Sequence, residues 1–395
     1  MSNQRAQRRE HTVGAGAGRP GNPGPAESAG GHPKPDGRSI GDLGEFGLIA
    51  EMAARMRPGP GTMLGPGDDA AVLAAPDGRV VATTDFLLEG RHFRRDWAGP
   101  ADIGHRAAVR SLADVAAMGA VATALLVAFA APPDLPAAWA LGVAEGLAAE
   151  CARAGASVAG GDVARFDAVL LAVTGLGDLQ GRNPVTRSGA RPHDVVAVAG
   201  PLGRSAAGLA LLQTGLAGSR ADPPRLTELA ELVRAHLRPA PPYDAGPEAA
   251  TLGATAMIDV SDGLLADLGH IADASEVAID VRAAALDTAP LEPAARALRA
   301  SAPAAAPAGA PDEGEANPGG DSGGTPSEAN PGDAPGPTAL GWVLTGGEDH
   351  SLVATFPPGV VLPARWSVIG AVREGHGVLV DGRAYEGAHG WDHFR

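Results

Sequence analysis

The sequence contains a single cysteine, Cys151, among 395 residues. An intrachain disulfide and a cluster of thiolate metal ligands are therefore both excluded. Aromatic residues make up only 4% of the chain, so its cores must be built mainly from Ala, Val and Leu. No apolar run is long enough to span a bilayer, and no apolar signal segment follows Met1, so we expect a cytoplasmic protein.

Positive charge is also scarce, because the formal net charge is −15 at neutral pH. A general nucleic-acid binder needs a basic surface, so this class is excluded. The sequence also lacks the Gly-x4-Gly-Lys-Ser/Thr phosphate loop, the His-Arg-Asp and Asp-Phe-Gly pair of protein kinases, the His-Glu-x-x-His zinc motif and the Gly-x-Ser-x-Gly elbow. Any phosphate chemistry must therefore use a different arrangement of residues.

Glycine and proline are abundant, with 56 and 35 residues, and they are unevenly distributed. Residues 1–38 and 301–337 are rich in Gly, Pro, Ala and charge, and they lack the apolar residues that a packed core needs. We expect a disordered N-terminal tail over 1–38 and a low-complexity insertion over 301–337. Strand-like and helix-like segments alternate elsewhere, which predicts an N-terminal domain over 39–185 and a C-terminal domain over 186–395.

Apolar spacing predicts the individual elements. Helices are predicted over 45–56, 101–118, 135–154, 204–212, 226–237 and 264–274, with Asp102 as a candidate N-cap. Strands are predicted over 79–86, 121–130, 157–160, 168–175, 194–199 and 255–260, with one or more late strands over 342–356.

Short acidic motifs recur along the chain, most of them beside glycine or at the ends of apolar segments. They are Gly67-Asp68-Asp69, Thr83-Thr84-Asp85, Ser111-Leu112-Ala113-Asp114, Gly160-Gly161-Asp162, Asp259-Val260-Ser261-Asp262-Gly263 and Gly346-Gly347-Glu348-Asp349. Hard oxygen ligands of this kind suit Mg²⁺, which binds through a few carboxylates together with substrate phosphates. We therefore interpret the chain as a metal-dependent enzyme of phosphate chemistry.

Several motifs also have an ordinary structural explanation. Gly67–Asp69 could be a polar turn, and Thr83–Asp85, predicted at a strand end, could form an Asx or Ser/Thr turn. Asp114 lies among alanines and valines, where a buried carboxylate is costly unless it is paired or ligated, so a functional role is favoured. Gly160–Asp162 is typical of a turn that a phosphate approaches closely.

The segment Asp259–Gly263 is predicted to end a strand and open a helix. Free backbone N–H groups at a helix N-terminus suit a phosphate, although Ser261 or Asp262 could serve only as an N-cap. Arg187 and the pair Arg91-His92 are candidate phosphate or substrate contacts, with a solvated surface charge as the alternative for each.

Taken together and in their order, these motifs resemble those of thiamine-monophosphate kinase. The resemblance covers roughly 41–394 without 301–337. It also includes Gly44-Glu45-Phe46-Gly47-Leu48-Ile49, His92-Phe93, Val115–Ala120, Thr186-Arg187-Ser188-Gly189, His236-Leu237-Arg238-Pro239 and Trp391-Asp392-His393-Phe394.

The resemblance implies transfer of the γ-phosphoryl group of ATP to thiamine monophosphate, without a phosphoenzyme and with several Mg²⁺ ions. Carried over by motif, the metal ligands would be Asp69, Thr83, Thr84, Asp85, Asp114, Asp162, Asp259 and Asp262, with Asp68 behind them. The ATP contacts would be Gly161, Asp162, Arg187 and Ser261. The substrate contacts would be His92, Glu348 and a C-terminal aromatic, for which Trp391 is the candidate.

The implied fold is the two-domain fold of aminoimidazole ribonucleotide synthetase, an α/β N-terminal domain and an α+β C-terminal domain. The N-terminal sheets would pair across a homodimer, and the ATP cleft would lie where they meet. Two positions depart from the family pattern. His350 stands where a tyrosine commonly follows Gly-Gly-Glu-Asp, and Ala388 stands where an aromatic can stack on the substrate.

Related enzymes provide the competing interpretations. A selenophosphate synthetase should carry a cysteine in its Gly-rich N-terminal segment, and the hydrogenase maturation factor should end in cysteine; this chain does neither. Aminoimidazole ribonucleotide synthetase lacks the Gly-Glu-Phe-Gly-Leu-Ile and Asp-His-Phe segments. A nucleotide-binding protein without catalytic activity should have lost some of the carboxylates, and none is missing.

Overall fold

The computed structural model describes residues 37–66, 70–216, 226–301, 338–387 and 390. The expected tail and insertion therefore lie outside the described residues, except for positions 37, 38 and 301. None of the described helices is long and apolar enough to cross a membrane.

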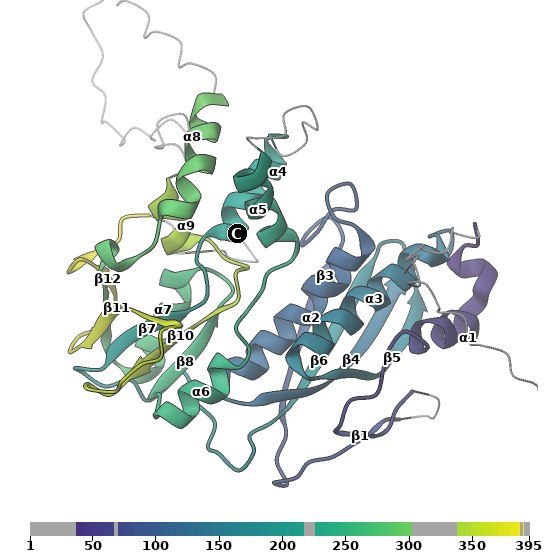
Figure 1. The fold of residues 1–395 in the computed structure, drawn as a ribbon, viewed down its shortest axis with the longest axis horizontal. Coiled ribbons are helices and arrows are strands. Elements are labelled where there is room, and N and C mark those ends of the chain that lie inside the picture. Colours follow the sequence, from purple (N-terminus) through teal and green to yellow (C-terminus); the bar gives the residue numbers. More distant parts are fainter. Residues whose placement is uncertain (1–36, 67–69, 217–225, 302–337, 388–389, 391–395) are drawn as a thin grey trace, which may run out of the picture. The chain divides into compact units, whose positions relative to one another are not determined.

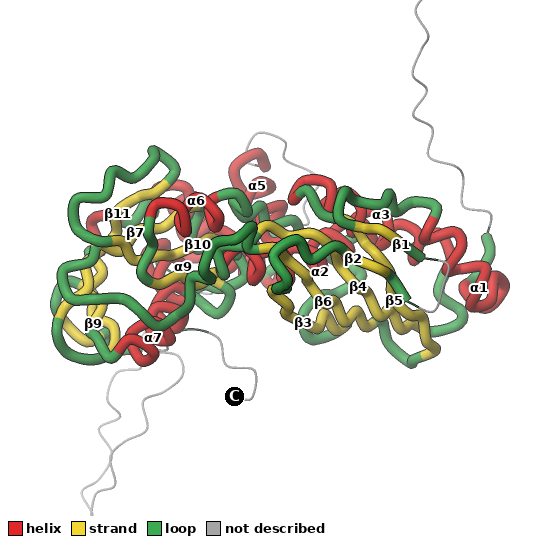
Figure 2. Tube along the Cα trace, turned by 90° about the horizontal axis from the view of Figure 1, so that it is seen from below, coloured by secondary structure: helices red, strands yellow, loops and turns green. Residues whose placement is uncertain are grey.

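A four-stranded sheet forms the first layer of the N-terminal half, with the strand order β3-β6-β4-β5. Its strands are β3 (Val81–Leu88), β4 (Val121–Ala131), β5 (Ser157–Arg165) and β6 (Leu170–Asp178). Strands β4 and β5 are parallel and the other pairs are antiparallel. Helices α2 (Pro100–Ala117) and α3 (Ala137–Ala154) pack side by side over one face of this sheet (Figures 1 and 2). Helix α1 (Ile40–Ala53) and the short strands β1 (Thr62–Leu64) and β2 (Val72–Leu73) precede it.

A seven-stranded sheet forms the C-terminal half, with the order β13-β12-β9-β11-β7-β10-β8. Its strands are β7 (Val195–Ala199), β8 (Ala256–Val260), β9 (Ala278–Val281), β10 (Ser351–Phe356), β11 (Trp366–Arg373), β12 (Gly377–Val380) and β13 (Arg383–Ala384). The helices of this half are α4 (Arg204–Gln213), α5 (Leu226–Leu237), α6 (Ala245–Leu252), α7 (Leu264–Ser275), α8 (Glu292–Ser301) and α9 (Ala339–Thr345), with two 3-10 turns, Ala283–Ala285 and Ala289–Leu291. Only the β9–β12 pair is parallel among these strands.

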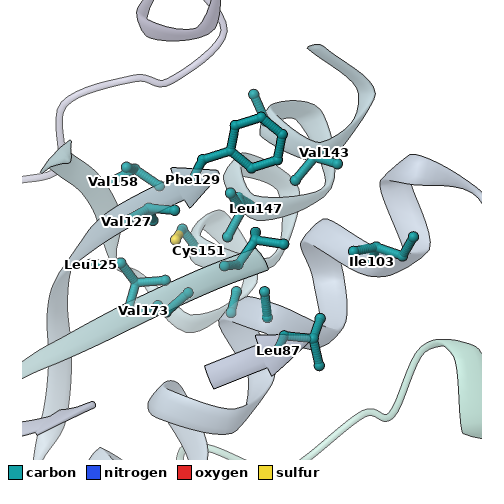
Figure 3. Packing of buried hydrophobic residues seen from close by; sticks show 14 of the residues in the cluster. Leu87, Ile103, Leu125, Val127, Phe129, Val143, Leu147, Cys151, Val158 and Val173 are labelled. Carbon is teal, nitrogen blue, oxygen red and sulfur yellow. The ribbon is translucent and has the colours of Figure 1, made fainter. Parts of the chain in front are cut away.

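The core of the first half lies between its sheet and helices α2 and α3, and aliphatic side chains dominate it (Figure 3). Glycine lets the two helices approach closely. A Cβ on Gly104 of α2 would lie 2.0 Å from the Val143 carbonyl oxygen, and a Cβ on Gly146 of α3 would lie 2.1 Å from the Ala101 carbonyl oxygen. Close backbone approach explains how a chain poor in aromatics still builds a dense core.

Most predicted elements are confirmed, with boundaries shifted by a few residues. One expectation was wrong and another was confirmed only in part. Gly99, not Asp102, is the N-cap of α2; Asp102 instead accepts a hydrogen bond from the Gly99 N–H at 3.0 Å, which is the reciprocal half of a capping box. The segment from Trp342 to Thr345 is helical, because Thr338 caps α9 by accepting from the Gly341 N–H at 3.0 Å; only Ser351–Phe356 forms the late strand.

Glu150 connects the two halves of the chain. Its carboxylate is buried and accepts hydrogen bonds from the Tyr243 hydroxyl at 2.6 Å and from Arg153 Nη2 at 2.5 Å. His105 Nδ1 lies 2.9 Å from the same carboxylate, and the Arg153 guanidinium stacks on the Tyr243 ring at 4.5 Å. Burial alone would raise the pKa of Glu150, but the interactions with His105 and Arg153 outweigh it and lower the pKa to about 2.

This lowered pKa predicts a pH-dependent contribution to stability. The contribution should be complete above the pKa of the unfolded chain and should be lost as the pH falls toward about 2. We expect Glu150→Gln to lower the free energy of unfolding by up to about 3 kcal/mol at neutral pH, and the difference from wild type to shrink between about pH 5 and about pH 2. This difference in the free energy of unfolding is measured by urea denaturation, monitored by circular dichroism, at a series of pH values. Glu145→Gln, which removes a half-exposed partner of Arg55, is the matched control and should change little. A Glu150 effect that does not depend on pH would contradict this account.

Candidate active site

Strand β3 divides the Thr83-Thr84-Asp85 motif between two faces of the sheet. The motif lies in the middle of the strand, not at its end as predicted. Side chains alternate along a strand, so Thr83 and Asp85 face helix α2 while Thr84 is exposed on the opposite face. Thr83 Oγ1 donates to Asp114 Oδ2 at 2.6 Å, and Asp85 Oδ1 lies 3.6 Å from Arg110 Nη2. Both partners are on α2.

Asp114 lies at the centre of a cluster of carboxylates. Burial is the main cause that raises its pKa to about 7, and the charges of Asp259 and Asp85 raise it further, against a lowering effect of the Thr83 hydrogen bond. Asp259 is buried at the end of β8 and interacts with His350 Nδ1 at 3.0 Å. Three of the predicted carboxylate ligands, from β3, α2 and β8, are thus brought together.

The donors of this cluster fit a hard divalent cation. They are carboxylate oxygens, and Asp85 Oδ2 is buried without a hydrogen-bond partner among the described residues. A cation would satisfy this oxygen and offset the repulsion that raises the pKa of Asp114. Within the described ranges, however, no three His, Cys, Asp or Glu side chains already form a group that could hold a metal.

Glu348 stands opposite the cluster, on the loop between α9 and β10. Its carboxylate accepts from Arg106 Nη2 at 2.9 Å and from Arg110 Nη1 at 2.5 Å, and it lies 3.9 Å from His350 Nε2. Burial would raise the pKa of Glu348, but Arg110, His350 and Arg106 hold it well below its usual value. Burial would lower the pKa of His350, but Asp259 and Glu348 raise it to about 10, so the imidazole is a cation.

Arg106 and Arg110 are the residues that our sequence reasoning missed. Arg106, Arg110 and Asp114 follow one another at intervals of four residues along α2, and this spacing places all three on one face of the helix. The spacing is visible in the sequence and could have identified them.

The loop before α7 does not offer the free N–H groups that we expected. Asp267 Oδ2, in the first turn of α7, accepts from the N–H groups of Ser261 at 3.0 Å and of Asp262 and Gly263 at 3.1 Å. Gly263 is the N-cap, with φ of 124°, a conformation that favours glycine. Burial chiefly raises the pKa of Asp267 to about 7, with Asp259 and Asp262 adding to it. The expectation was wrong because a side chain one turn away occupies these donors.

Gly160-Gly161-Asp162 lies within β5 and does not form the expected turn. A Cβ on Gly161 would lie 1.9 Å from the Val127 carbonyl oxygen, so glycine is required by the neighbouring strand. Asp162 is exposed and pairs with Ala128 across the sheet. Ala128 pairs with Ala172, which pairs with Phe86, and these residues form a row on the face that α2 and α3 leave uncovered.

Two other predicted site residues have partners outside the Asp114 cluster. The Arg187 side chain is exposed, and its carbonyl oxygen accepts from Ser275 Oγ at 3.0 Å. His92 Nδ1 accepts from the Leu88 N–H at 3.0 Å, at the end of β3. Asp68, Asp69 and Trp391 lie outside the described residues.

The chain is similar to known proteins over most of its length. Residues 67–179 match the family model of the AIR synthase related protein, N-terminal domain. The chain is 45% identical over 355 residues to the thiamine-monophosphate kinase of Mycobacterium tuberculosis, covering 89% of this chain and 92% of that protein.

The chain belongs to the thiamine-monophosphate kinase family.

Further relatives agree with this assignment. The thiamine-monophosphate kinase of Corynebacterium glutamicum is 37% identical, with 91% of this chain and 96% of that protein covered. The crystal structure of the thiamine-monophosphate kinase from Stenotrophomonas maltophilia matches with a TM-score of 0.65 at 31% identity, covering 86% of this chain and 96% of that one. The structure of AaThiL complexed with AMPPCP and TMP matches with a TM-score of 0.66 at 29% identity, covering 89% and 98%.

These matches confirm the expected fold class, the two-domain α/β and α+β fold of aminoimidazole ribonucleotide synthetase. The hydrogenase maturation protein HypE of Escherichia coli, at 18% identity and a TM-score of 0.57, shares the fold alone.

The hydrogen bonds of Asp267 lead to a testable prediction about the loop at 261–263. At about pH 8.5, above the raised pKa of Asp267, the neutral side chain of Asp267→Asn should weaken these bonds, at a cost of about 1–3 kcal/mol for the local structure. We expect faster hydrogen exchange at the amides of Ser261, Asp262 and Gly263, measured by mass spectrometry. Asp273→Asn, an exposed change on the same helix, is the control and should leave them unchanged. Equal exchange in both variants would contradict the role assigned to Asp267.

Proposed function

We propose that this protein transfers the γ-phosphoryl group of ATP to thiamine monophosphate, giving thiamine diphosphate and ADP, in thiamine diphosphate biosynthesis. The single observation that carries the proposal is the meeting of Asp85, Asp114 and Asp259 with Arg110 in one partly buried cluster. Membership of the kinase family supports the choice of substrates, as does the relative AaThiL, whose complex holds TMP and AMPPCP, an analogue of ATP.

The same proposal includes Mg²⁺ as the cofactor. Asp85, Asp114 and Asp259 would hold one such ion, and Asp69, Thr83, Thr84, Asp162 and Asp262 would complete the ligand set of several Mg²⁺ ions. When bound, the metal would neutralise and orient the phosphate oxygens, which is most of what phosphoryl transfer requires. Thr83 fixes one oxygen of Asp114, and His350 orients Asp259. No side chain is needed as a covalent nucleophile, because the acceptor phosphate attacks directly.

The roles of the remaining predicted residues are part of this proposal. Gly161, Asp162, Arg187 and Ser261 would contact ATP, and His92, Glu348 and Trp391 would contact thiamine monophosphate. Glu348 already has a fixed orientation, because Arg106 and Arg110 bind its two oxygens separately. Residues 39–185 would be the domain that binds ATP and metal, and 186–395 the second domain, in a protein of the cytoplasm.

We also propose a homodimer in which the uncovered faces of the four-stranded sheets pair. On this face the Phe86 side chain is 58% exposed. Thr84 and Asp162, two predicted metal ligands that do not join the Asp114 cluster, are exposed there as well. Dimerisation would bury Phe86 and give Thr84 and Asp162 a partner surface.

A product assay tests the proposed reaction. Purified protein with ATP, Mg²⁺ and thiamine monophosphate should give equal amounts of thiamine diphosphate and ADP, as measured by anion-exchange chromatography. Asp114→Ala should lower turnover by at least about 100-fold, because it removes a group that holds the charge-neutralising metal. Light scattering should show dimers of both proteins.

The control for this assay is Asp134→Ala, which removes an exposed carboxylate and should leave turnover unchanged. Turnover of a different phosphoryl acceptor, with no thiamine diphosphate, would contradict the reaction. Near wild-type turnover by Asp114→Ala would contradict the role of the cluster, and a monomeric wild-type protein would contradict the dimer.

A further inference from the structure

Arg110 is the side chain that joins the carboxylate cluster to the Glu348 loop. It extends from α2 one turn before Asp114, and only 11% of its side chain is exposed. Its Nη1 donates to Glu348 Oε1 at 2.5 Å, whereas its Nη2 lies 3.6 Å from Asp85 Oδ1, beyond a normal hydrogen bond. The guanidinium is therefore held firmly on one side only.

The Arg110 guanidinium has N–H groups that do not donate a normal hydrogen bond within the described part of the chain. Its Nε is buried and has no hydrogen-bond partner within the described part of the chain. Buried donors are almost always satisfied, by protein, water or ligand, because an unpaired one is costly. Asp85 Oδ2, which also has no partner among the described residues, lies in the carboxylate that faces this guanidinium. An unpaired donor and an unpaired acceptor in neighbouring side chains mark a place for a charged ligand with its metal.

Glu348 does not depend on Arg110 for neutralisation. Arg106 Nη2 donates to its second oxygen at 2.9 Å, and His350 Nε2 lies 3.9 Å away. One carboxylate thus has two arginine neighbours and a histidine. If the Arg110 guanidinium bound another anion in place of Glu348, Glu348 would still accept a hydrogen bond from Arg106. Arg110 can therefore change partners without leaving the buried Glu348 carboxylate unpaired.

We propose that Arg110 binds a phosphate group of one of the two substrates, and is therefore a catalytic residue of the reaction proposed above, on which this inference rests. A guanidinium presents a planar fork of donors that matches two phosphate oxygens. Since Arg110 and Asp114 share one face of α2, a phosphate bound by Arg110 lies beside the carboxylates proposed to hold Mg²⁺. The phosphate belongs either to thiamine monophosphate or to ATP.

Ligand binding separates these two sources. Calorimetric titrations in Mg²⁺ buffer would compare thiamine monophosphate, thiamine and AMPPCP on wild type, Arg110→Met and the control Arg365→Met. Arg365 is an exposed arginine that pairs with Asp244 and Glu248 at the surface. Loss of a charge-assisted hydrogen bond predicts that Arg110→Met binds one phosphate ligand about 10- to 100-fold more weakly. Binding of thiamine, which has no phosphate, should not change.

The outcomes are distinct. Weaker binding of thiamine monophosphate alone assigns Arg110 to the acceptor phosphate, and weaker binding of AMPPCP alone assigns it to ATP. Wild-type affinity for both ligands in Arg110→Met would overturn the inference. If that variant does not fold, Arg110→Gln, which can still donate to Glu348, provides the same comparison. A wild type that binds both ligands without forming thiamine diphosphate contradicts the proposed reaction but not the role of Arg110. A wild type that binds neither contradicts both.

Discussion

Buried negative charge is the constraint on which the rest of the site depends. Asp85, Asp114 and Asp259 lie close enough that two of them raise the pKa of the third, and such a group is tolerated only if cations offset it. Arg110 faces Asp85, and the His350 imidazolium holds Asp259. These cations leave Asp85 Oδ2 without a partner in the described part of the chain, so the cluster is neutralised only in part by the protein itself.

The cluster exists because both halves of the chain contribute to it. Asp85 and Asp114 come from β3 and α2, whereas Asp259 and His350 come from β8 and the loop before β10. Contacts elsewhere hold α2 against the second half. Ala116 and Ala117 pack in a cluster with residues of β7 and β10, and Glu150 binds Tyr243. Packing at a distance from the site therefore sets the distances between its carboxylates.

The sequence was informative wherever a residue conflicted with its local surroundings. Asp114 could be predicted because a carboxylate among alanines is costly unless it is paired. A segment rich in Val and Thr predicted β3, an apolar run predicted β4, and apolar spacing predicted α2. The acceptor of the N–H groups before α7 could not be predicted. It is the Asp267 carboxylate, which the first turn of α7 places beside these donors. The sequence suggested that Gly161 lies in a turn. The structure shows instead that glycine is needed there because the Val127 carbonyl of the adjacent strand leaves no room for a side chain. Such a contact joins residues far apart in the sequence and could not be predicted.

We propose that a metal and a phosphate together complete the carboxylate cluster. Titration of wild-type protein with AMPPCP in the presence and absence of Mg²⁺ tests this claim most directly. We predict that binding requires Mg²⁺, with an affinity at least about 10-fold lower without it, because each phosphate would otherwise meet unscreened carboxylates. Equal affinity with and without Mg²⁺ would contradict the account.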